Sequence, residues 1–328
     1  MQDIILTGVK PTGVPHIGNY FGAIKPTLDR ANSDNQTLVF IADYHALNTI
    51  KEPKLLKKLT QELACVWLAC GGDNPNITLY KQSDVPEVFE LNWILNNVTP
   101  KGLLNRAHAY KSVVEENLKA GNDPDDSVNM GLYNYPVLMA ADIVSMNATK
   151  VPVGLDQKQH IEIAKEIVRV FNNAYGQTLV APEGIIDNNL KTVVGLDGRK
   201  MSKSYNNTIE LFCTENELKK KINRVITNSQ LPGEKKDIDC SIFKIYELFA
   251  TPSERENMIK LFNEGIGWGE VKKLVFDVAN RYLAPMREKY NYYLQHPEIV
   301  NDILEQGAKK ARAMASKTLA RVRKAIGK

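Results

Sequence analysis

The first hundred residues alternate between continuous apolar runs and segments in which apolar positions have helical spacing. Three apolar runs are typical of strands buried on both faces of a sheet, at residues 3–9, 37–43 and 77–83. Helices are expected between and after these strands, at residues 17–30, 54–70 and 85–98. Alternation of this kind predicts a parallel sheet with helices on both of its faces.

The pattern changes twice further along the chain. Residues 99–130 are polar and acidic, and they are expected to form a mobile connection. The earlier pattern then resumes, with a helix after Pro136, a strand at 150–154 and a helix from about Asp156 to Asn172. Residues 209–328 carry almost no strand signal and are expected to be helical.

The predicted fold class is therefore α/β. A Rossmann-like parallel-sheet nucleotide-binding domain is expected at residues 1–200, with a connective insertion at about 99–130. An all-α helical domain is expected at residues 201–328, with the boundary within 196–210. The C-terminal helix is expected to pack back on the first domain.

Composition narrows the class of protein but not the function. The chain has 328 residues, of which 43% are apolar and 24% are charged, as in an ordinary globular protein. It contains no apolar run near 20 residues, so no membrane span is expected. The N-terminus lacks a basic region followed by an apolar stretch, so no secretion signal is expected and the predicted location is the cytoplasm.

The distribution of charge says more than the net charge of +4. The last 20 residues carry eight Lys or Arg and no acidic residue. A helix of this kind can bind a phosphate backbone, although the same composition fits a solvated helix face equally well.

Cysteine and histidine spacing predicts no metal site built from protein ligands. None of Cys65, Cys70, Cys213 and Cys240 forms a C-x-x-C pair, and the five histidines form no H-E-x-x-H motif. The cysteines are interpreted as reduced and structural.

Two short motifs carry the chemistry. Pro15-His16-Ile17-Gly18-Asn19 follows the first strand, where a glycine allows close approach of the backbone and a helix N-terminus can face an anion. Lys200-Met201-Ser202-Lys203-Ser204 follows the turn 196–198 and offers positive charge to a polyphosphate. Each alone also fits a plain turn or a solvated loop, but together they indicate an enzyme that activates a carboxylic acid with ATP.

This pair of motifs resembles the signatures of the class I aminoacyl-tRNA synthetases. Within that class the chain resembles the tryptophanyl-tRNA synthetase family over almost its full length. The supporting segments are GVKPTGVPHIGNYFGA, IADYHAL, YPVLMAADI, VPVGLDQKQHIEIAKEI, KMSKS and GAKKARAMASKTLARVRKAIG.

The resemblance implies a tryptophan pocket. Asp142 corresponds to the acid that accepts a hydrogen bond from the indole N–H. The indole ring has one donor and no acceptor, so a carboxylate is a suitable partner. Gln157 and His45 correspond to polar residues near the ammonium group and the ring of the amino acid. The remaining implied pocket residues are Gly8, Tyr135, Met139, Val151 and Val153.

The resemblance also implies an ATP site, with Lys200, Lys203 and Lys111 as catalytic residues. Mg²⁺ is expected with ATP, held mainly by phosphate oxygens. The implied ATP-binding residues are Lys10, Pro11, Thr12, His16, Gly18, Asn19, Gly154, Leu155, Asp156, Val193, Lys200, Met201, Ser202, Lys203 and Ser204.

Three features depart from the family's pattern. Position 10 is Lys where many members carry Gln, which adds positive charge beside the expected phosphate site. Leu6 stands where an aromatic residue is common, so a stacking partner for the indole is in doubt there. The loop before Lys200 is compact, where many relatives have a longer connection.

The implied function is tryptophan–tRNA ligation, with L-tryptophan, ATP and tRNA(Trp) as partners, by a homodimer without membrane attachment. Apolar surface on residues 85–98 and 131–146 is a candidate dimer interface. Three alternatives remain open: a tyrosyl-tRNA synthetase, a small-molecule nucleotidyltransferase of the same fold, and a non-catalytic RNA-binding paralogue.

Overall fold

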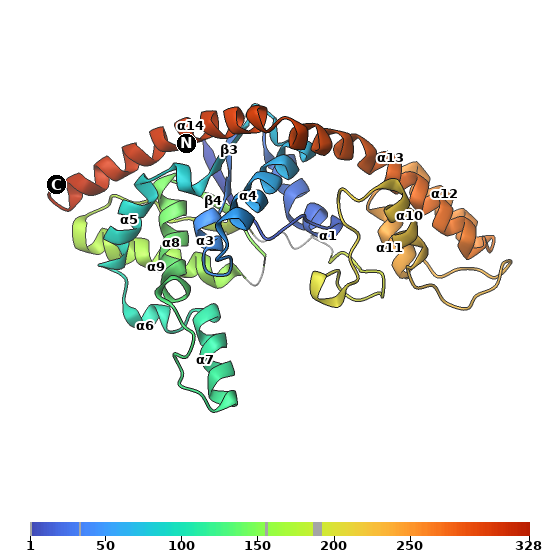
Figure 1. Cartoon of the computed structure of the whole chain (residues 1–328), viewed down its shortest axis with the longest axis horizontal. Coiled ribbons are helices and arrows are strands. Elements are labelled where there is room, and N and C mark those ends of the chain that lie inside the picture. Colours follow the sequence, from blue (N-terminus) through green and yellow to red (C-terminus); the bar gives the residue numbers. More distant parts are fainter. Residues whose placement is uncertain (1, 33, 155–156, 186–191) are drawn as a thin grey trace.

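The structure is a computed structural model that describes residues 2–32, 34–154, 157–185 and 192–328. Five strands pair in parallel in the order β3-β2-β1-β4-β5, which confirms the predicted parallel sheet (Figure 1). The strands are β1 (Asp3–Val9), β2 (Asn35–Ile41), β3 (Ile77–Lys81), β4 (Lys150–Pro152) and β5 (Glu183–Ile185).

The strand order reverses between β1 and β4. The chain adds β2 and β3 on one side of β1, and then returns to place β4 and β5 on the other side. In open parallel sheets the crevice outside the carboxyl ends of the strands at such a reversal is where ligands bind. The residues that follow Val9 and Pro152 therefore lie at the expected binding edge.

Helices connect the strands and then form most of the C-terminal half. The first part of the chain contains α1 (Ile17–Asn19), η1 (Tyr20–Ile24), α2 (Lys25–Arg30), α3 (Asp43–Ala46), α4 (Pro53–Trp67), η2 (Leu68–Gly72), η3 (Gln82–Asp84), α5 (Glu87–Asn96), α6 (Lys101–Leu104), α7 (His108–Ala120), α8 (Met130–Ser145) and α9 (Lys158–Tyr175). The second part contains η5 (Lys203–Tyr205), α10 (Glu215–Asn223), α11 (Ser241–Glu247), α12 (Pro252–Asn263), α13 (Trp268–Gln295) and α14 (Pro297–Ala325).

The alternation of side chains along β2 divides the core into two clusters. Leu38 and Phe40 pack on one face of the sheet, together with buried residues of α5, α8 and α9. Val39 and Ile41 pack on the other face, in a cluster that continues through α4 into the helices of the C-terminal half. The continuous apolar runs in the sequence are thus explained by burial on both faces.

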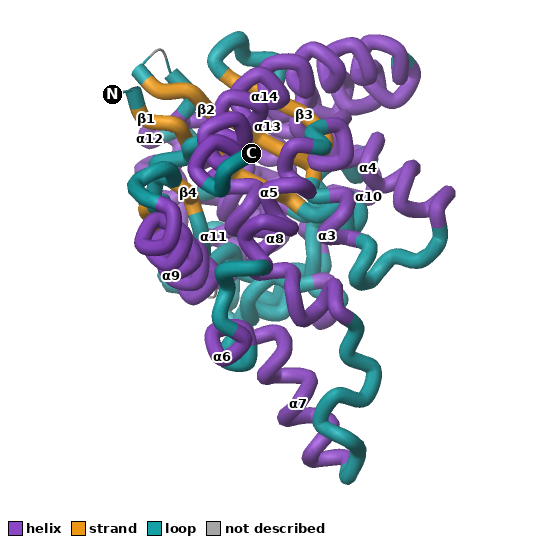
Figure 2. The backbone as a smooth tube through the Cα atoms, turned by 90° about the vertical axis from the view of Figure 1, so that its left-hand side faces the viewer, coloured by secondary structure: helices purple, strands orange, loops and turns teal. Residues whose placement is uncertain are grey.

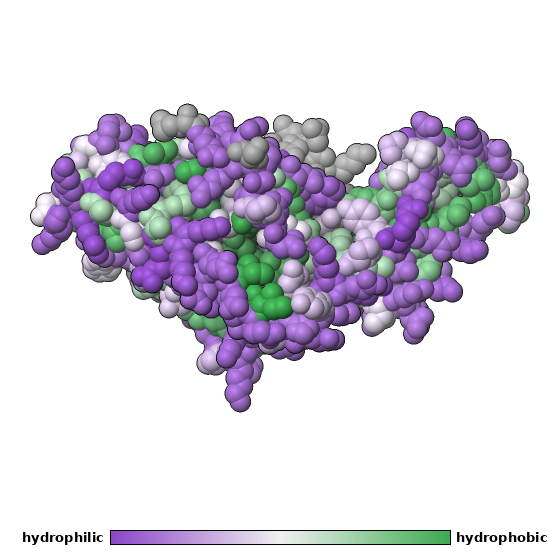
Figure 3. Space-filling view, turned by 90° about the horizontal axis from the view of Figure 1, so that it is seen from above, coloured by the Kyte–Doolittle hydropathy of each residue, from purple (hydrophilic) through white to green (hydrophobic). Residues whose placement is uncertain are grey.

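The long C-terminal helix α14 runs across the sheet (Figure 1). It packs against β3, α5 and α8. A Cβ atom on Gly307 would lie 1.8 Å from the carbonyl oxygen of Leu79, so only glycine allows the helix to approach β3 this closely. Seen from above, most of the surface is hydrophilic, and apolar side chains gather in separate patches (Figure 3).

Two local predictions were wrong. Residues 99–130 were expected to form a mobile connection, for which no helix was predicted, but they contain α6 and α7, which project from the body of the molecule (Figures 1 and 2). No residue of α7 is buried, so its sequence lacks the apolar face that helical spacing detects. The helix expected after Pro136 begins six residues earlier, at Met130, where the side chain of Asn129 accepts a hydrogen bond from Leu132 N at 2.9 Å.

Among the described residues, no helix combines the length and apolar character needed to cross a membrane. The four cysteines are all free. Burial raises the pKa of the Cys65 and Cys213 thiols to about 11, so these two side chains are held in the protonated form.

Candidate active site

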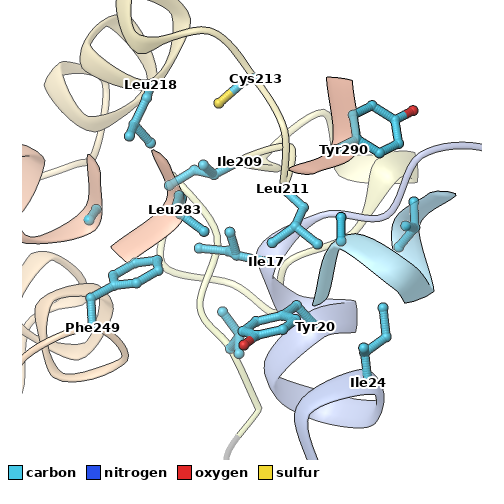
Figure 4. Close-up of a cluster of buried hydrophobic side chains, with 14 of the residues drawn as sticks. Ile17, Tyr20, Ile24, Ile209, Leu211, Cys213, Leu218, Phe249, Leu283 and Tyr290 are labelled. Atoms are coloured by element: carbon cyan, nitrogen blue, oxygen red, sulfur yellow. The ribbon is translucent and has the colours of Figure 1, made fainter. Parts of the chain in front are cut away.

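The first motif packs against the segment that follows the second. Ile17 N donates to Ile209 O at 2.9 Å, and Leu211 N donates to Pro15 O at 3.0 Å. Figure 4 shows Ile17 and Tyr20 packed among Ile209, Leu211 and helices of the C-terminal half. Two stretches that are far apart in the sequence are therefore joined by backbone hydrogen bonds and a shared apolar cluster.

Met201 and Lys203 bring the lysine-rich loop against the first motif and the turn before it. A Cβ atom on Gly18 would lie 2.8 Å from the His16 ring and 3.6 Å from the Met201 Cβ, so a side chain there would have no room. Nζ of Lys203 donates to the carbonyl oxygen of Thr12 at 3.4 Å. The lysine-rich loop thus reaches the turn after β1, and the structure brings together the two predicted halves of the ATP site.

The lysine-rich loop begins in a tight hairpin. Met201 N donates to Val193 O at 2.9 Å, and Gly195 N donates to Arg199 O at 2.7 Å. Gly198, in the turn of this hairpin, has a φ of +80°, a conformation that favours glycine. Val193 is buried below the hairpin, whereas Lys200 is exposed.

Asn207 organises this loop, and the sequence analysis did not identify it. Its side chain is 2% exposed. Its Nδ2 donates to Asp197 Oδ1 at 2.7 Å and to Lys200 O at 3.1 Å, while its Oδ1 accepts from Ser202 N at 2.8 Å. Asn207 therefore pins both ends of the Lys200–Ser202 segment, and the hydroxyls of Ser202 and Ser204 lie 2.9 Å apart beyond it.

His16 lies at the base of the same contact. Burial lowers the pKa of His16, and the positive charge of Lys203 lowers it further. The backbone N–H of His16 donates to Oδ1 of Asn19 at 3.1 Å. Its ring nitrogen Nδ1 is buried next to Gly18.

Asp142 forms the centre of a buried polar network on the other side of the site. It is 2% exposed, and Nε2 of His45 lies 2.9 Å from its Oδ2. Nε2 of Gln82 lies 2.9 Å from each of its two carboxylate oxygens. Burial raises the pKa of Asp142, whereas the hydrogen bonds from His45 and Gln82 oppose that rise.

Gln82 is the second functional candidate that the sequence analysis missed. The pattern placed it at the end of the third apolar run, whereas the structure places it in η3, just after β3. A single polar residue after a strand carries no periodic signal. Its contact with Asp142 depends on the shared core cluster that holds α8 against the face of the sheet that carries Tyr80.

Tyr135 joins this network to the turn after β1. Its hydroxyl forms a hydrogen bond with Nε2 of His160, whose Nδ1 lies 2.9 Å from Oε1 of Gln157. Nζ of Lys10 lies 5.7 Å from the centre of the Tyr135 ring, and the His45 ring lies 6.3 Å from it. Burial lowers the pKa of Lys10, although part of the residue remains exposed. Lys10 is thus positioned between the predicted phosphate and amino-acid sites.

The other predicted pocket residues lie around this edge. A Cβ atom on Gly8 would lie 2.3 Å from the Phe40 ring, so this position requires glycine. Met139 and Val153 are half-buried, Val151 is buried, and Gly154 is exposed after β4. Leu6 is 1% exposed and belongs to the apolar core.

One residue of the implied ATP site lies apart from this group, and two lie outside the described residues. Lys111 lies on the projecting helix α7, where Nζ is 3.5 Å from Glu115 Oε1 (Figure 2). Leu155 and Asp156 lie outside the described residues.

A model of the family described as "tRNA synthetases class I (W and Y)" matches residues 2–284. The tryptophan–tRNA ligase of Neisseria meningitidis is 49% identical over 326 residues, which cover 98% of this chain and 97% of that one. The chain belongs to the tryptophan–tRNA ligase family.

Two further relatives agree with this membership. The tryptophan–tRNA ligase of Pseudomonas aeruginosa is 48% identical over 332 residues, covering 100% of this chain and 74% of the relative. The crystal structure of Campylobacter jejuni tryptophanyl-tRNA synthetase, complexed with ADP and tryptophan, superposes with a TM-score of 0.90 at 41% identity. That similarity covers 99% of this chain and 100% of the other, so the class I synthetase fold of the tryptophan–tRNA ligase family extends over the whole chain.

Proposed function

We propose that this chain activates L-tryptophan with ATP and transfers it to the 3′ end of tRNA(Trp). The observation that carries the proposal is a pair of features on one sheet edge. A buried acceptor, Asp142, lies on one side, and the contact of Lys203 with the turn at Thr12 lies on the other. This arrangement supplies a slot for an N–H donor next to a cationic loop.

In the proposed first step, a carboxylate oxygen of tryptophan attacks the α-phosphorus of ATP. The bond from that phosphorus to the bridging oxygen breaks, and pyrophosphate leaves with the electron pair. Because the carboxylate is already a nucleophile, positioning and charge stabilisation are sufficient for catalysis. Lys200 and Lys203 would neutralise the leaving pyrophosphate, with Lys203 held near the turn after β1 by Thr12.

The nucleotide would lie over the turn at Gly18, where the missing side chain admits close approach. We assign the N-terminal end of the helical run from α1 through α2, where His16 is the N-cap, to the phosphate side. Lys10, Pro11, Thr12, Asn19, Gly154, Leu155, Asp156, Val193, Met201, Ser202 and Ser204 complete the proposed ATP site.

Mg²⁺ would enter with the substrate as the ATP complex. Among the described residues, no group of three His, Cys, Asp or Glu side chains is placed to hold a metal ion. We infer that the phosphate oxygens of ATP hold the ion, which would offset their negative charge during the reaction.

The proposed amino-acid specificity follows from the donors around Asp142. Gln82 and His45 both direct N–H groups at the carboxylate, so a ligand must meet it with a further donor. The indole N–H meets this requirement and needs no donor in return. Tyr135, Met139, Val151, Val153, Gly8, His45 and Gln157 would surround the ring and the ammonium group.

In the second step, the 2′-hydroxyl of the terminal adenosine would attack the adenylate carbonyl and release AMP. We assign tRNA recognition to the helical residues 201–328. Two cations of the basic tail are already paired with the first domain: Arg312 with Glu87 at 3.3 Å, and Arg323 with Glu90. Lys310, Lys317 and Lys324 recur every seven residues on the exposed side of α14 and remain candidates for phosphate contacts.

We also propose a homodimer in the cytoplasm, formed through the aromatic surface of α3 and α5. Trp93 is 71% exposed, one helical turn beyond Phe89, whose ring centre lies 4.5 Å from that of Tyr44. Tyr44 and Leu47 are exposed on the adjoining α3 segment, next to the buried His45. A second copy covering this surface would remove large apolar side chains from water.

The test is ATP–pyrophosphate exchange with each of the twenty amino acids, followed by charging of tRNA(Trp). Exchange that depends on tryptophan alone is the expected result. Exchange that depends on tyrosine would favour the tyrosyl alternative, and exchange with no amino acid would favour a non-catalytic paralogue.

The dimer is tested separately by analytical ultracentrifugation. Trp93→Glu should shift the protein toward monomer, whereas Trp268→Phe, inside the C-terminal core, should not change the oligomeric state. A wild-type protein that sediments as a monomer would overturn the dimer.

A further inference from the structure

The side chain of Gln82 is fully engaged at both ends. It is 1% exposed and sits between α3 and α8. Its Oε1 lies 3.2 Å from Tyr44 N and 3.3 Å from His45 N. Its Nε2 lies 2.9 Å from both oxygens of Asp142.

These partners determine which way the amide points. A backbone N–H can only donate, so the atom of Gln82 that faces Tyr44 and His45 must be the carbonyl oxygen. The NH₂ group must then face Asp142. The reversed amide would place two donors against two backbone donors, and its oxygen against a carboxylate. The backbone of α3 and the carboxylate therefore favour the same orientation of the amide.

A second contact holds this arrangement in place. Ser83, the next residue, donates from its backbone N–H to Asp43 Oδ1 at 3.0 Å and from its hydroxyl to Asp43 Oδ2. Asp43 also begins α3, and its Oδ1 accepts from Tyr44 N at 3.1 Å. The turn η3 and helix α3 are therefore locked together before any ligand enters, and Gln82 is preorganised.

We propose that Gln82 is a positioning and specificity-determining residue of the amino-acid site, which holds Asp142 as an acceptor aimed at the indole N–H. This inference rests on the proposed function. Because Gln82 donates to both carboxylate oxygens, a proton on either one would compete with an existing donor. Gln82 therefore favours the ionised form of Asp142, in a place where burial alone favours the protonated form.

The charge environment of Asp142 includes other titratable groups. His45 and Asp43 face it from α3, and the fully buried Tyr80 faces it from β3. His45 favours the ionised carboxylate, whereas Asp43 opposes it. Gln82 is the neutral partner in this group, so its removal changes the hydrogen bonds without removing a formal charge.

The first experiment compares two amino acids in the Gln82→Met protein. Methionine keeps the length and apolar stem but has no amide. We measure kcat/KM by pyrophosphate exchange for L-tryptophan and for β-(benzothiophen-3-yl)-alanine, in which sulfur replaces the indole N–H. Loss of a hydrogen bond to a charged group corresponds to about tenfold or more, so the preference for tryptophan should fall by about that factor.

Two further readouts separate positioning from a structural role. The KM for ATP should stay unchanged, and the acid limb of the kcat/KM profile for tryptophan should move to higher pH. The matched control is Gln159→Met. Gln159 also bridges elements through its amide, with Oε1 accepting from His108 N and Nε2 donating to Arg106 O, both at 2.9 Å, but it does not touch Asp142. This control should leave the preference unchanged.

Gln82→Glu supplies the rescue. When protonated, this glutamic acid can donate to Asp142 and still accept from α3, so its preference for tryptophan should rise as the pH falls. If Gln82→Met does not fold, this profile decides the question: a preference that does not vary with pH overturns the proposal. Equal losses for both amino acids in Gln82→Met would also overturn it. Absence of tryptophan-dependent exchange in the wild type would instead reject the proposed function.

Discussion

The two sides of the site are built in opposite ways. On the amino-acid side, Asp142 is buried and is held by His45 and Gln82, whose own positions are set by the backbone and by Ser83. On the nucleotide side, Lys200 and Lys203 are exposed, and Lys203 makes one long contact with Thr12 O at 3.4 Å. The acceptor on one side is held by buried hydrogen bonds before a ligand arrives, whereas the lysine side chains on the other are exposed.

This difference matches the two tasks of the proposed reaction. Choosing one amino acid requires an acceptor whose position and charge do not adapt to the wrong ligand, because an unpaired buried polar group then penalises that ligand. Neutralising a leaving pyrophosphate requires cations that can follow charge as it develops. In the proposed reaction, the buried network would therefore control which substrate reacts, and the exposed lysines would control how fast it reacts.

The largest effect is expected from Asp142→Ala. It removes the acceptor for the indole N–H and also leaves the donors of Gln82 and His45 without their partner. The kcat/KM for tryptophan in pyrophosphate exchange should fall by roughly a thousandfold, with little change in the KM for ATP. Asp142→Asn keeps one acceptor oxygen and should lose less. Tryptophan-dependent exchange at the wild-type level in the alanine variant would contradict the assignment of Asp142.

Lys203→Ala should have the next largest effect, and on rate alone. Without this ammonium the leaving pyrophosphate loses a stabilising charge, so single-turnover adenylate formation should slow by about a hundredfold. Equilibrium binding of tryptophan should stay close to wild type. Lys54→Ala, at an exposed lysine near the start of α4, is the control for loss of one positive charge. A normal single-turnover rate in Lys203→Ala would remove Lys203 from the mechanism.

Lys10→Gln tests the nucleotide side of the site through the pH dependence of ATP affinity. The positive charge of Lys10 is present below its pKa and is lost above it. Because burial lowers that pKa, ATP affinity in the wild type should begin to weaken at a lower pH than for an ordinary lysine. The glutamine variant should bind ATP several-fold more weakly near neutral pH, and this alkaline limb should be absent. If ATP affinity weakens at high pH in the same way in both proteins, a group other than Lys10 is responsible.

The smallest effect is expected from Lys111→Ala in the arrangement that the structure shows. Lys111 lies on the projecting α7 and pairs with Glu115, so its removal should change the adenylation rate by about twofold at most. Glu115→Ala serves as the matched control on the same helix. A tenfold or larger slowing in Lys111→Ala alone would show that α7 closes onto the triphosphate during the reaction, and would support the catalytic role that the family resemblance implies.

Much of the fold follows directly from local patterns. The strands β1, β2 and β3 were predictable because apolar runs such as residues 37–43 have to be buried on both faces. The edge strand β5 was missed because its three residues include one glutamate and one glycine, and no apolar run marks them. The helix α7 was missed because an exposed helix has no buried face to leave a pattern.

The sequence by itself determined the class of fold, the family and the residue types of the site, because these depend on local periodicity and on motifs whose spacing is visible along the chain. Only the tertiary structure decided that Lys203 reaches Thr12, that Asn207 pins the lysine-rich loop, and that Gln82 holds Asp142. Hydrogen bonds between distant residues form only when their atoms are positioned to within a few tenths of an ångström. This precision is reached only when the whole sheet and the helices on both of its faces are packed together.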